Sequence, residues 1–201
     1  RVREHNFTLD GLMGFDLYQK TVGAVGVGSI GKAFCQIMQG FGMRVLAYDK
    51  DKRELPGVTY VDNLDELLQA SDVISLHLPL TPETHHILDA AAFEKMKKNV
   101  IVVNTGRGAL IDSQALIQAL KKGQIRGAGL DVYEEEENYF FHDLSNQIIQ
   151  DDALARLLSF PNVLITSHQG FFTEDALENI AATTLQNLNE LDAGSELSHT
   201  V

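Results

Sequence analysis

The chain has 201 residues, and 44% of them are hydrophobic, enough to bury the core of one large or two small domains. Its 16 Lys and Arg against 28 Asp and Glu give a formal net charge of -12, which argues against binding to nucleic acid or an anionic membrane. The single cysteine, Cys35, excludes an internal disulfide, no Cys/His spacing suits a structural zinc, and no apolar stretch is as long as a membrane span. We therefore expect a globular protein of a reducing compartment, the cytoplasm.

Short β-branched runs alternate along the chain with stretches of 3.6-residue periodicity, which is the pattern of βαβ units around a parallel sheet. Strands are expected at residues 22–27, 44–48, 73–77, 100–104, 127–131 and 163–166. Helices are expected at residues 29–40, 64–70, 90–97, 112–122 and 173–191. Because the strands lack polar alternation, they are expected to be buried on both faces. The sequence therefore predicts an α/β fold with a doubly wound parallel sheet and helices on both faces.

Two parts of the sequence depart from this alternation, the insertion before residue 153 and the final helix at residues 173–191, which follows Gly170. Residues 134–152 form an acidic insertion with several aromatic residues, which is too long for an ordinary connection and therefore predicts a functional loop. The chain also opens on a charged stretch that begins at Arg1 rather than at a methionine. We take this as a hint that the natural protein has a further part upstream.

Gly26, Gly28 and Gly31 form a GxGxxG motif between a predicted strand and a predicted helix, which is the context that a dinucleotide site requires. The first glycine permits the tight turn, the second lets the backbone approach a pyrophosphate, and the third lets helix and strand pack closely. The helix N-terminus at Ser29 and Ile30 supplies free N–H groups for the diphosphate. The motif thus predicts a Rossmann-type site, although a glycine-rich turn that binds nothing has the same pattern.

Asp49 ends the second predicted strand, at the distance from the glycines where a carboxylate meets the adenosine ribose. A carboxylate accepts hydrogen bonds from a 2′-hydroxyl but repels a 2′-phosphate, so we expect NAD rather than NADP. Lys50, Lys52 and Arg53 are near enough to soften that repulsion, but they also fit an ordinary solvated loop.

Three more segments end predicted strands at the same edge, where folds of this type bind ligands. Arg107 lies between two glycines, and its planar guanidinium suits bidentate capture of a small carboxylate. Asp131 leads into four consecutive glutamates, and His168 follows the last strand. Each also has a simpler interpretation: a surface arginine in a turn, a solvated acidic loop, and a structural histidine.

Taken in order, these motifs resemble those of the D-isomer-specific 2-hydroxyacid dehydrogenases. The resemblance is carried by the GxGxxG with Asp49 and by residues 77–84, 104–112, 129–134 and 167–169. Within the family, the acidic and aromatic insertion is similar to that of the fermentative D-lactate dehydrogenases. The resemblance implies reduction of pyruvate to D-lactate by NADH.

The resemblance also implies roles for individual residues. Arg107 matches the arginine that binds the substrate carboxylate and polarises the keto oxygen, and His168 matches the acid that donates the proton. Glu136 matches the carboxylate paired with that histidine. Such a pair suits keto reduction, because the growing alkoxide charge needs a proton donor and a nearby cation.

For the cofactor, the resemblance implies contacts at both ends. Asp131 matches the residue that hydrogen-bonds the nicotinamide carboxamide, and Asn104 and Thr105 line that end. His77 and Pro79 match the loop that passes the adenosine side.

The family has two lobes, so the resemblance implies residues 1–172 as the NAD-binding domain. Residues 173–201 would then be a helix and tail that return to a substrate domain outside this chain, and the helix would leave an apolar face partly exposed. Homodimerisation through the cofactor domain is also implied. Two alternatives stay open: a dehydrogenase for a bulkier 2-keto acid, and a non-catalytic NAD-sensing relative.

Overall fold

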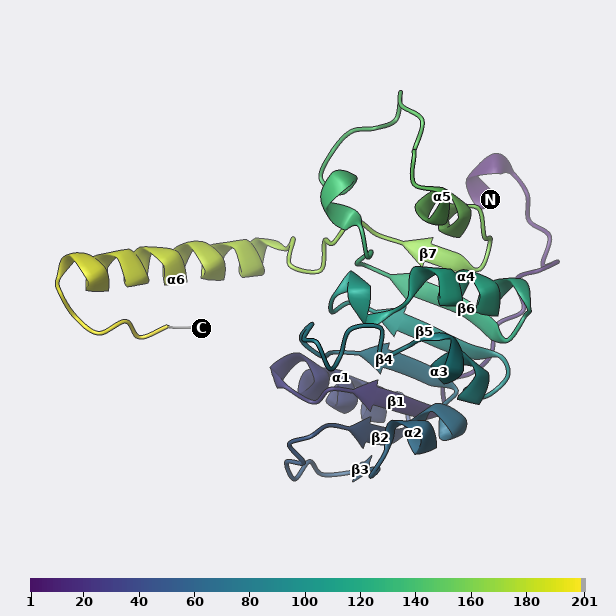
Figure 1. Cartoon of the computed structure of the whole chain (residues 1–201), viewed down its shortest axis with the longest axis horizontal. Coiled ribbons are helices and arrows are strands. Elements are labelled where there is room, and N and C mark those ends of the chain that lie inside the picture. Colours follow the sequence, from purple (N-terminus) through teal and green to yellow (C-terminus); the bar gives the residue numbers. More distant parts are fainter. Residues whose placement is uncertain (200–201) are drawn as a thin grey trace.

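The β-branched runs assemble into one parallel sheet in the computed structural model, which describes residues 1–199. Its strands are β1 (Thr21–Val25), β2 (Arg44–Tyr48), β3 (Val58–Tyr60), β4 (Val73–Leu76), β5 (Val100–Asn104), β6 (Ile125–Leu130) and β7 (Val163–Ile165). Their order across the sheet is β3-β2-β1-β4-β5-β6-β7, from the bottom to the top of Figure 1, and every neighbouring pair is parallel. Because the order runs outward from β1 in both directions, the predicted doubly wound Rossmann-type fold is confirmed.

Helices connect the strands, and their first turns are mostly capped by side chains. They are α1 (Ser29–Gly40), α2 (Leu64–Ala70), α3 (Ala90–Lys95), α4 (Ser113–Lys121), α5 (Asp152–Leu158) and α6 (Glu174–Asp192). The capping side chains, each of which accepts a hydrogen bond from a first-turn N–H group, belong to Asn63, Asp89, Asp112, Asp151 and Thr173. The exception is α1, which starts after Gly28 without a side-chain cap. Its first-turn N–H groups therefore remain available at the glycine motif.

The two faces of the sheet carry separate hydrophobic cores. One face is covered by α1 together with Phe15 and Leu17 of the segment before β1, and the other by α2, α3, α4 and α5. Successive residues of a strand belong to opposite cores, as Ala24 and Val25 of β1 do. This arrangement explains why the strands show no polar alternation, and it confirms the prediction of helices on both faces.

The last helix, α6, extends away from the sheet (Figure 1), and none of its residues is buried. The predicted exposure of apolar side chains in this helix and just before it is confirmed for Phe171, Phe172, Leu177, Ile180, Leu185, Leu188 and Leu191. Within the described residues, no helix is both long and apolar enough to span a membrane. Positions 200–201 of the predicted C-terminal tail lie outside the described residues.

Several predicted elements differ from the observed bounds by one or two residues at an end, and two short elements, β3 and α5, were not predicted. Strand β3 has only three residues and pairs with β2 at the edge of the sheet, directly after the turn at Gly57. Helix α5 begins at Asp152, the last residue of the segment interpreted as an insertion, and Asp151 caps it. The insertion is therefore a loop that leads into a short helix packed on the sheet.

Candidate active site

The candidate residues follow the carboxyl ends of β1, β2, β4, β5, β6 and β7, which lie along one edge of the parallel sheet. The sequence separates them by up to about 140 positions, but the topology brings their loops together at this edge.

The three glycines of the loop after β1 are needed for different structural reasons. Gly26 has a φ of +90°, and a Cβ there would lie 2.8 Å from the backbone carbon of His77. At Gly31, a Cβ would lie 2.2 Å from the carbonyl oxygen of Gly26. At Gly28, in contrast, a Cβ would meet nothing within 4 Å. The fold itself therefore requires Gly26 and Gly31, whereas the open space at Gly28 suits close approach by a ligand.

Asp49 fixes its carboxylate beside this loop. One oxygen, Oδ2, accepts a hydrogen bond from the Val27 N–H at 2.6 Å, and Oδ1 accepts one from the Asp51 N–H at 2.9 Å. The carboxylate at the end of β2 is thus held against the glycine loop at the end of β1, its neighbour in the sheet. Ser29 and Ile30 in the first turn of α1 are exposed at the same place.

His77 lies beneath the glycine loop. Its ring centroid is 4.7 Å from that of Phe34 in α1, and its Nε2 atom is buried without a hydrogen-bond partner among residues 1–199. Burial lowers the pKa of His77 to about 4, so the ring is neutral at pH 7. The side chain therefore packs under the loop, whereas Pro79, two residues later, is exposed at the surface.

Asn104 organises the turn that carries Arg107. Its Nδ2 donates a hydrogen bond to the Arg107 carbonyl at 2.9 Å, and its Oδ1 accepts one from the Gly106 N–H at 3.0 Å. Thr105 and Arg107 are exposed. Arg107 donates to the Gly106 carbonyl at 2.8 Å and forms no ion pair within the described part of the chain. Most of its guanidinium fork therefore remains available to an anion.

Asp131 holds the loop that carries His168. Its carboxylate accepts hydrogen bonds from the Thr166 hydroxyl and from the N–H groups of Gln169 and Gly170, the latter two at 3.0 Å each. Its carbonyl accepts a hydrogen bond from the His168 N–H at 2.6 Å. Burial alone would raise the pKa of Asp131, but these hydrogen bonds outweigh burial and lower it. The ionised carboxylate thus fastens both sides of the His168 turn.

His168 and Glu136 meet at the centre of the candidate site. His168 has a φ of +51°, which turns its side chain back toward the loop after β6. There its Nδ1 lies 2.7 Å from Glu136 Oε1, and the other Glu136 oxygen, Oε2, accepts a hydrogen bond from the Tyr133 N–H at 2.9 Å. Both side chains are partly exposed, at 31% and 20%. The structure therefore forms the predicted His–Glu pair and leaves His168 Nε2 as the free nitrogen.

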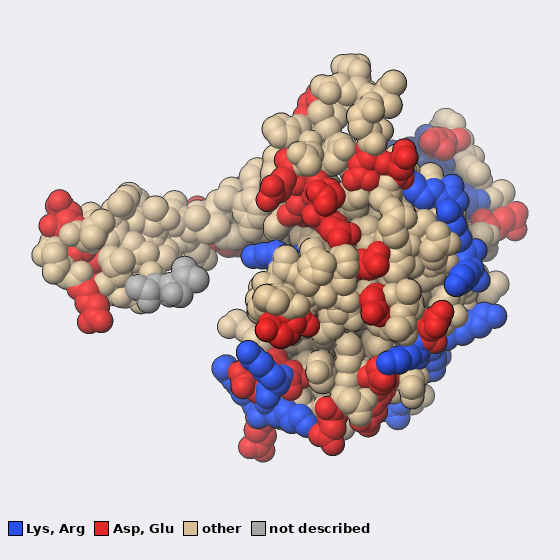
Figure 2. All heavy atoms as spheres, viewed as in Figure 1, with Lys and Arg blue, Asp and Glu red and all other residues tan. Residues whose placement is uncertain are grey.

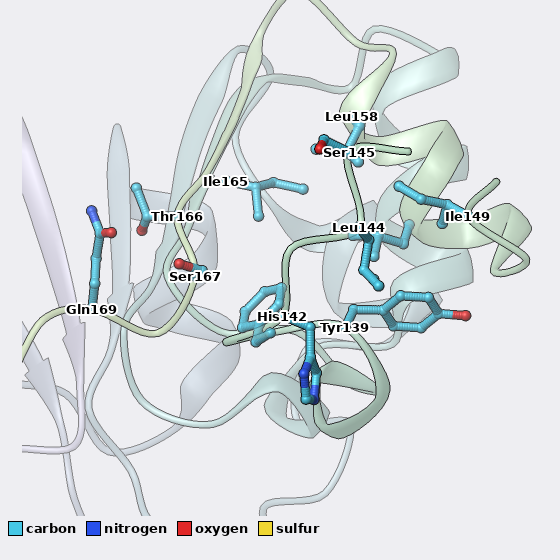
Figure 3. Close-up of a pocket in the computed structure, with 12 residues that line it drawn as sticks. Tyr139, His142, Leu144, Ser145, Ile149, Leu158, Ile165, Thr166, Ser167 and Gln169 are labelled. Carbon is cyan, nitrogen blue, oxygen red and sulfur yellow. The ribbon is translucent and has the colours of Figure 1, made fainter. Parts of the chain in front are cut away.

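The insertion forms one wall of a cavity beside this pair. Its two ends are tied together by the Tyr133 hydroxyl, which donates a hydrogen bond to Asp151 Oδ2 at 2.6 Å. The cavity has a volume of about 530 Å³. Figure 3 shows side chains of the insertion, Tyr139, His142 and Leu144, on one side of this space and those around the end of β7 on the other. The cavity thus adjoins the loop that presents His168.

The sequence prediction missed residues whose hydrogen bonds hold the candidate site residues in place. Thr166 and Tyr133 are two examples, because they anchor Asp131 and Glu136 respectively. Asn104, predicted to line the cofactor, directs its side chain to the Arg107 turn. The available signal for Thr166 was its position, two residues before His168 at the end of a strand.

These features fit a dinucleotide. Such a cofactor needs room for its pyrophosphate, N–H donors and a carboxylate for its ribose. The open space at Gly28, the uncapped start of α1 and Asp49 after the second strand offer these three features.

Comparisons with known proteins point the same way. The model of the family "D-isomer specific 2-hydroxyacid dehydrogenase, NAD binding domain" matches residues 1–170. The D-lactate dehydrogenase of Escherichia coli (strain K12) is 55% identical over 197 residues, which cover 96% of this chain and 60% of that protein. The structure of the pyruvate reductase of Chlamydomonas reinhardtii matches with a TM-score of 0.94 and 43% identity, over 99% of this chain and 61% of that one. The D-lactate dehydrogenase of Aquifex aeolicus, complexed with NAD and lactic acid, matches with a TM-score of 0.87 and 37% identity, over 96% of this chain and 60% of that one.

The chain spans about 60% of the length of these relatives. The family model nevertheless covers most of the chain, and it confirms both the predicted resemblance and the predicted cofactor, NAD. The chain belongs to the D-isomer specific 2-hydroxyacid dehydrogenases and contains their NAD binding domain.

Proposed function

We propose that the protein is an NAD-dependent D-lactate dehydrogenase that reduces pyruvate to D-lactate. The observation that carries this proposal is the His168–Glu136 pair, 2.7 Å apart, at the sheet edge that also bears the glycine loop. NADH would supply the hydride. The residues of this chain would bind the keto acid, orient it and deliver the proton.

His168 would be the proton donor. Because Nδ1 faces Glu136, the nitrogen directed away from that carboxylate is Nε2, which would protonate the keto oxygen. Glu136 holds the imidazole so that Nε2 points away from it, and the proton donor is therefore positioned before the reaction.

Arg107 would bind the substrate. Its planar guanidinium can hold a carboxylate through two parallel hydrogen bonds, and its charge would stabilise the alkoxide that forms on the neighbouring carbon. Asn104 would act through Arg107 by fixing the turn on which it lies.

The cofactor would lie along the same edge, between two sets of residues. Gly26, Gly28, Ser29, Ile30 and Gly31 would accommodate the pyrophosphate, with Asp49 at the adenosine ribose, and His77 and Pro79 would support the adenosine side. Asn104, Thr105 and Asp131 would flank the nicotinamide. Since a carboxylate repels a 2′-phosphate, KM is expected to be lower for NADH than for NADPH. A lower KM for NADPH would contradict the role of Asp49.

Pyruvate is the proposed substrate because the relatives include D-lactate dehydrogenases and a pyruvate reductase. The cavity of about 530 Å³ beside the His168 loop is not a measure of the substrate pocket, since it is open to the surface. Because the cavity does not define the size of the substrate, a branched 2-keto acid should be assayed beside pyruvate.

We further propose that residues 1–172 are the cofactor domain and that the apolar side chains of α6 dock on a substrate domain of the full-length protein.

Homodimerisation would use the cofactor domain, which exposes apolar residues before β1, among them Phe7 at 70% and Leu9 at 83%. The mass in solution tests this. We also propose a cytoplasmic location and a role in fermentation; the buried, unpaired thiol of Cys35 fits the reducing environment of the cytoplasm.

The decisive assay follows NADH oxidation by the full-length gene product with pyruvate, and then determines the configuration of the product. We expect turnover that yields D-lactate, and slower turnover with a branched 2-keto acid. Binding of NADH without turnover of either acid would instead favour the NAD-sensing alternative.

A further inference from the structure

Two histidines and a glutamate meet outside the candidate active site. His85 and His86 lie in the loop between β4 and α3, and Glu134 lies in the segment after β6. One potential ligand atom from each residue lies within 4.8 Å of the other two. The proposed reaction uses none of these side chains. We refer to the three as the His–His–Glu cluster.

The backbone places both imidazoles on one side of their loop. Neighbouring residues in an extended chain point to opposite sides, but His86 has a φ of +51°, in the left-handed region that few residues other than glycine adopt. The two rings consequently stack with their centroids 3.9 Å apart. The His86 N–H also donates to the Ala109 carbonyl at 2.8 Å, which anchors the turn.

The glutamate is fixed before any ion arrives. Its Oε2 accepts hydrogen bonds from the Ser113 hydroxyl at 2.8 Å and from the Ser113 N–H, the first residue of α4, at 3.3 Å. Its Oε1 lies 2.5 Å from His86 Nε2. A ligating carboxylate oriented by outer hydrogen bonds is a regular feature of metal sites. Figure 2 shows further acidic side chains gathered where the loop after β6 meets the body of the protein, which favours a cation.

The geometry points to a site for a transition-metal dication such as Zn²⁺, with one nitrogen each from His85 and His86 and one oxygen from Glu134. Two imidazoles and a carboxylate are a ligand set that zinc accepts, at distances of about 2.0–2.2 Å. Ligand atoms at such distances lie within roughly 4 Å of one another. The exposed His85 side chain can close the remaining gap by rotating, and a water molecule would complete the coordination.

Such an ion would link two loops that the active site depends on. Glu134 precedes the proposed His168 partner, Glu136, by two residues. Binding would replace the His86–Glu134 hydrogen bond by two metal–ligand bonds and add a third from His85. We therefore expect Zn²⁺ to stabilise the folded chain as well as to bind it.

The test is a titration of the metal-stripped chain with zinc sulfate by calorimetry, with the melting temperature as a second readout. His85 is exposed, so His85→Gln should keep the metal-free melting temperature of the parent. We expect it to raise the Kd for Zn²⁺ by more than about tenfold and to abolish the thermal stabilisation. Ser113→Ala, which removes an outer hydrogen bond, should raise the Kd by about tenfold.

Two control variants separate this site from other histidines. His142→Gln removes an exposed histidine of the insertion, and His168→Gln removes the other His–Glu pair. Both should retain the zinc site. The proposal is overturned if the parent chain binds no Zn²⁺ at submillimolar concentrations, if His85→Gln binds it as tightly as the parent, or if His168→Gln alone abolishes binding.

Discussion

Three features fix the orientation of the His168 imidazole, two in its backbone and one in its side chain. Its backbone has a φ of +51°, its N–H donates to the Asp131 carbonyl at 2.6 Å, and its Nδ1 faces Glu136 at 2.7 Å. Since a left-handed backbone conformation is costly for a residue other than glycine, the surrounding contacts must maintain it. The imidazole is therefore held in one orientation without a ligand, as its proposed role of proton donor requires.

Glu136→Gln tests how the pair works. The substitution keeps a side chain of similar size but replaces the carboxylate that faces His168 Nδ1 with a neutral amide. The imidazole then loses an orienting charge-assisted hydrogen bond of about 1.5–3 kcal/mol, so kcat for pyruvate reduction should fall roughly 10- to 100-fold. Glu137→Gln, at an exposed neighbour, is the matched control and should keep the parental kcat. Equal kcat values for the two variants would refute the coupling of Glu136 to His168.

Arg107→Lys tests recognition of the substrate carboxylate. Lysine keeps the charge but cannot reproduce the planar fork, so at least one charge-assisted hydrogen bond of about 1.5–3 kcal/mol is lost. We expect kcat/KM for pyruvate to fall roughly 10- to 100-fold. Arg126→Lys, at the opposite end of β6 from the site, should have little effect. Equal kinetics for the two variants would exclude Arg107 from substrate binding.

In the loop between β1 and α1, some glycines are required by the fold and others by the bound cofactor. A Cβ at Gly31 collides with backbone, whereas one at Gly28 enters open space. The same motif thus contains a glycine that the fold needs and one whose lack of a side chain matters only to a ligand.

Substituting these glycines one at a time should separate the two demands. Gly31→Ala should destabilise the chain by about 1–3 kcal/mol, because overpacking against backbone cannot relax cheaply. Gly28→Ala should keep nearly the parent melting temperature but weaken NADH binding, measured by fluorescence titration. Gly40→Ala, at the far end of α1 where a Cβ also meets nothing, should change neither property. A Gly28→Ala chain with parental NADH affinity would contradict the placement of the pyrophosphate.

The packing of His77 between the glycine loop and α1 predicts acid sensitivity. Its pKa is about 4 when folded, against about 6.5 in the unfolded chain. As the pH falls, the unfolded chain therefore binds a proton at this histidine before the folded chain does. The neutral ring contributes about 3 kcal/mol to the free energy of unfolding above pH 6.5, and this contribution is lost as the pH falls to about 4.

His77→Gln should reduce this loss. Urea unfolding at pH 7.5 and pH 4.5 gives the free energy of unfolding for each variant, and the difference between the two pH values should be smaller in His77→Gln than in the parent. The exposed His142→Gln control should behave as the parent does. An equal loss in all three chains would show that His77 is not the titrating group.

The sequence predicted the bounds of an element well where clear end signals enclose an apolar or amphipathic run. Helices α1 and α2 and strands β2 and β5 have the predicted bounds, because glycines or polar residues stand at their ends. Strand β3 has too few residues to show a period, and its place is decided by pairing with β2. Helix α5 depends on packing against β7 and on the Asp151 cap. Its seven residues begin at the end of an acidic segment interpreted as a loop, so the sequence did not predict it.

At the scale of the whole molecule, the site exists because one sheet edge collects the ends of six strands. Sequence motifs could identify Arg107, Glu136 and His168 separately, but only the β6–β7 pairing brings the last two together. Supporting contacts such as Thr166 to Asp131 have no motif, since they arise from how two loops meet. For the same reason, the His–His–Glu cluster could not be predicted from the spacing of His85, His86 and Glu134.

The sharpest test of acid-assisted hydride transfer to pyruvate at this sheet edge is the variant His168→Ala. In the full-length gene product, kcat for pyruvate should fall by about 10²–10⁴-fold, the usual contribution of a positioned acid, while the Kd for NADH stays unchanged. Turnover by His168→Ala at nearly the parental rate would show that His168 is not the proton donor.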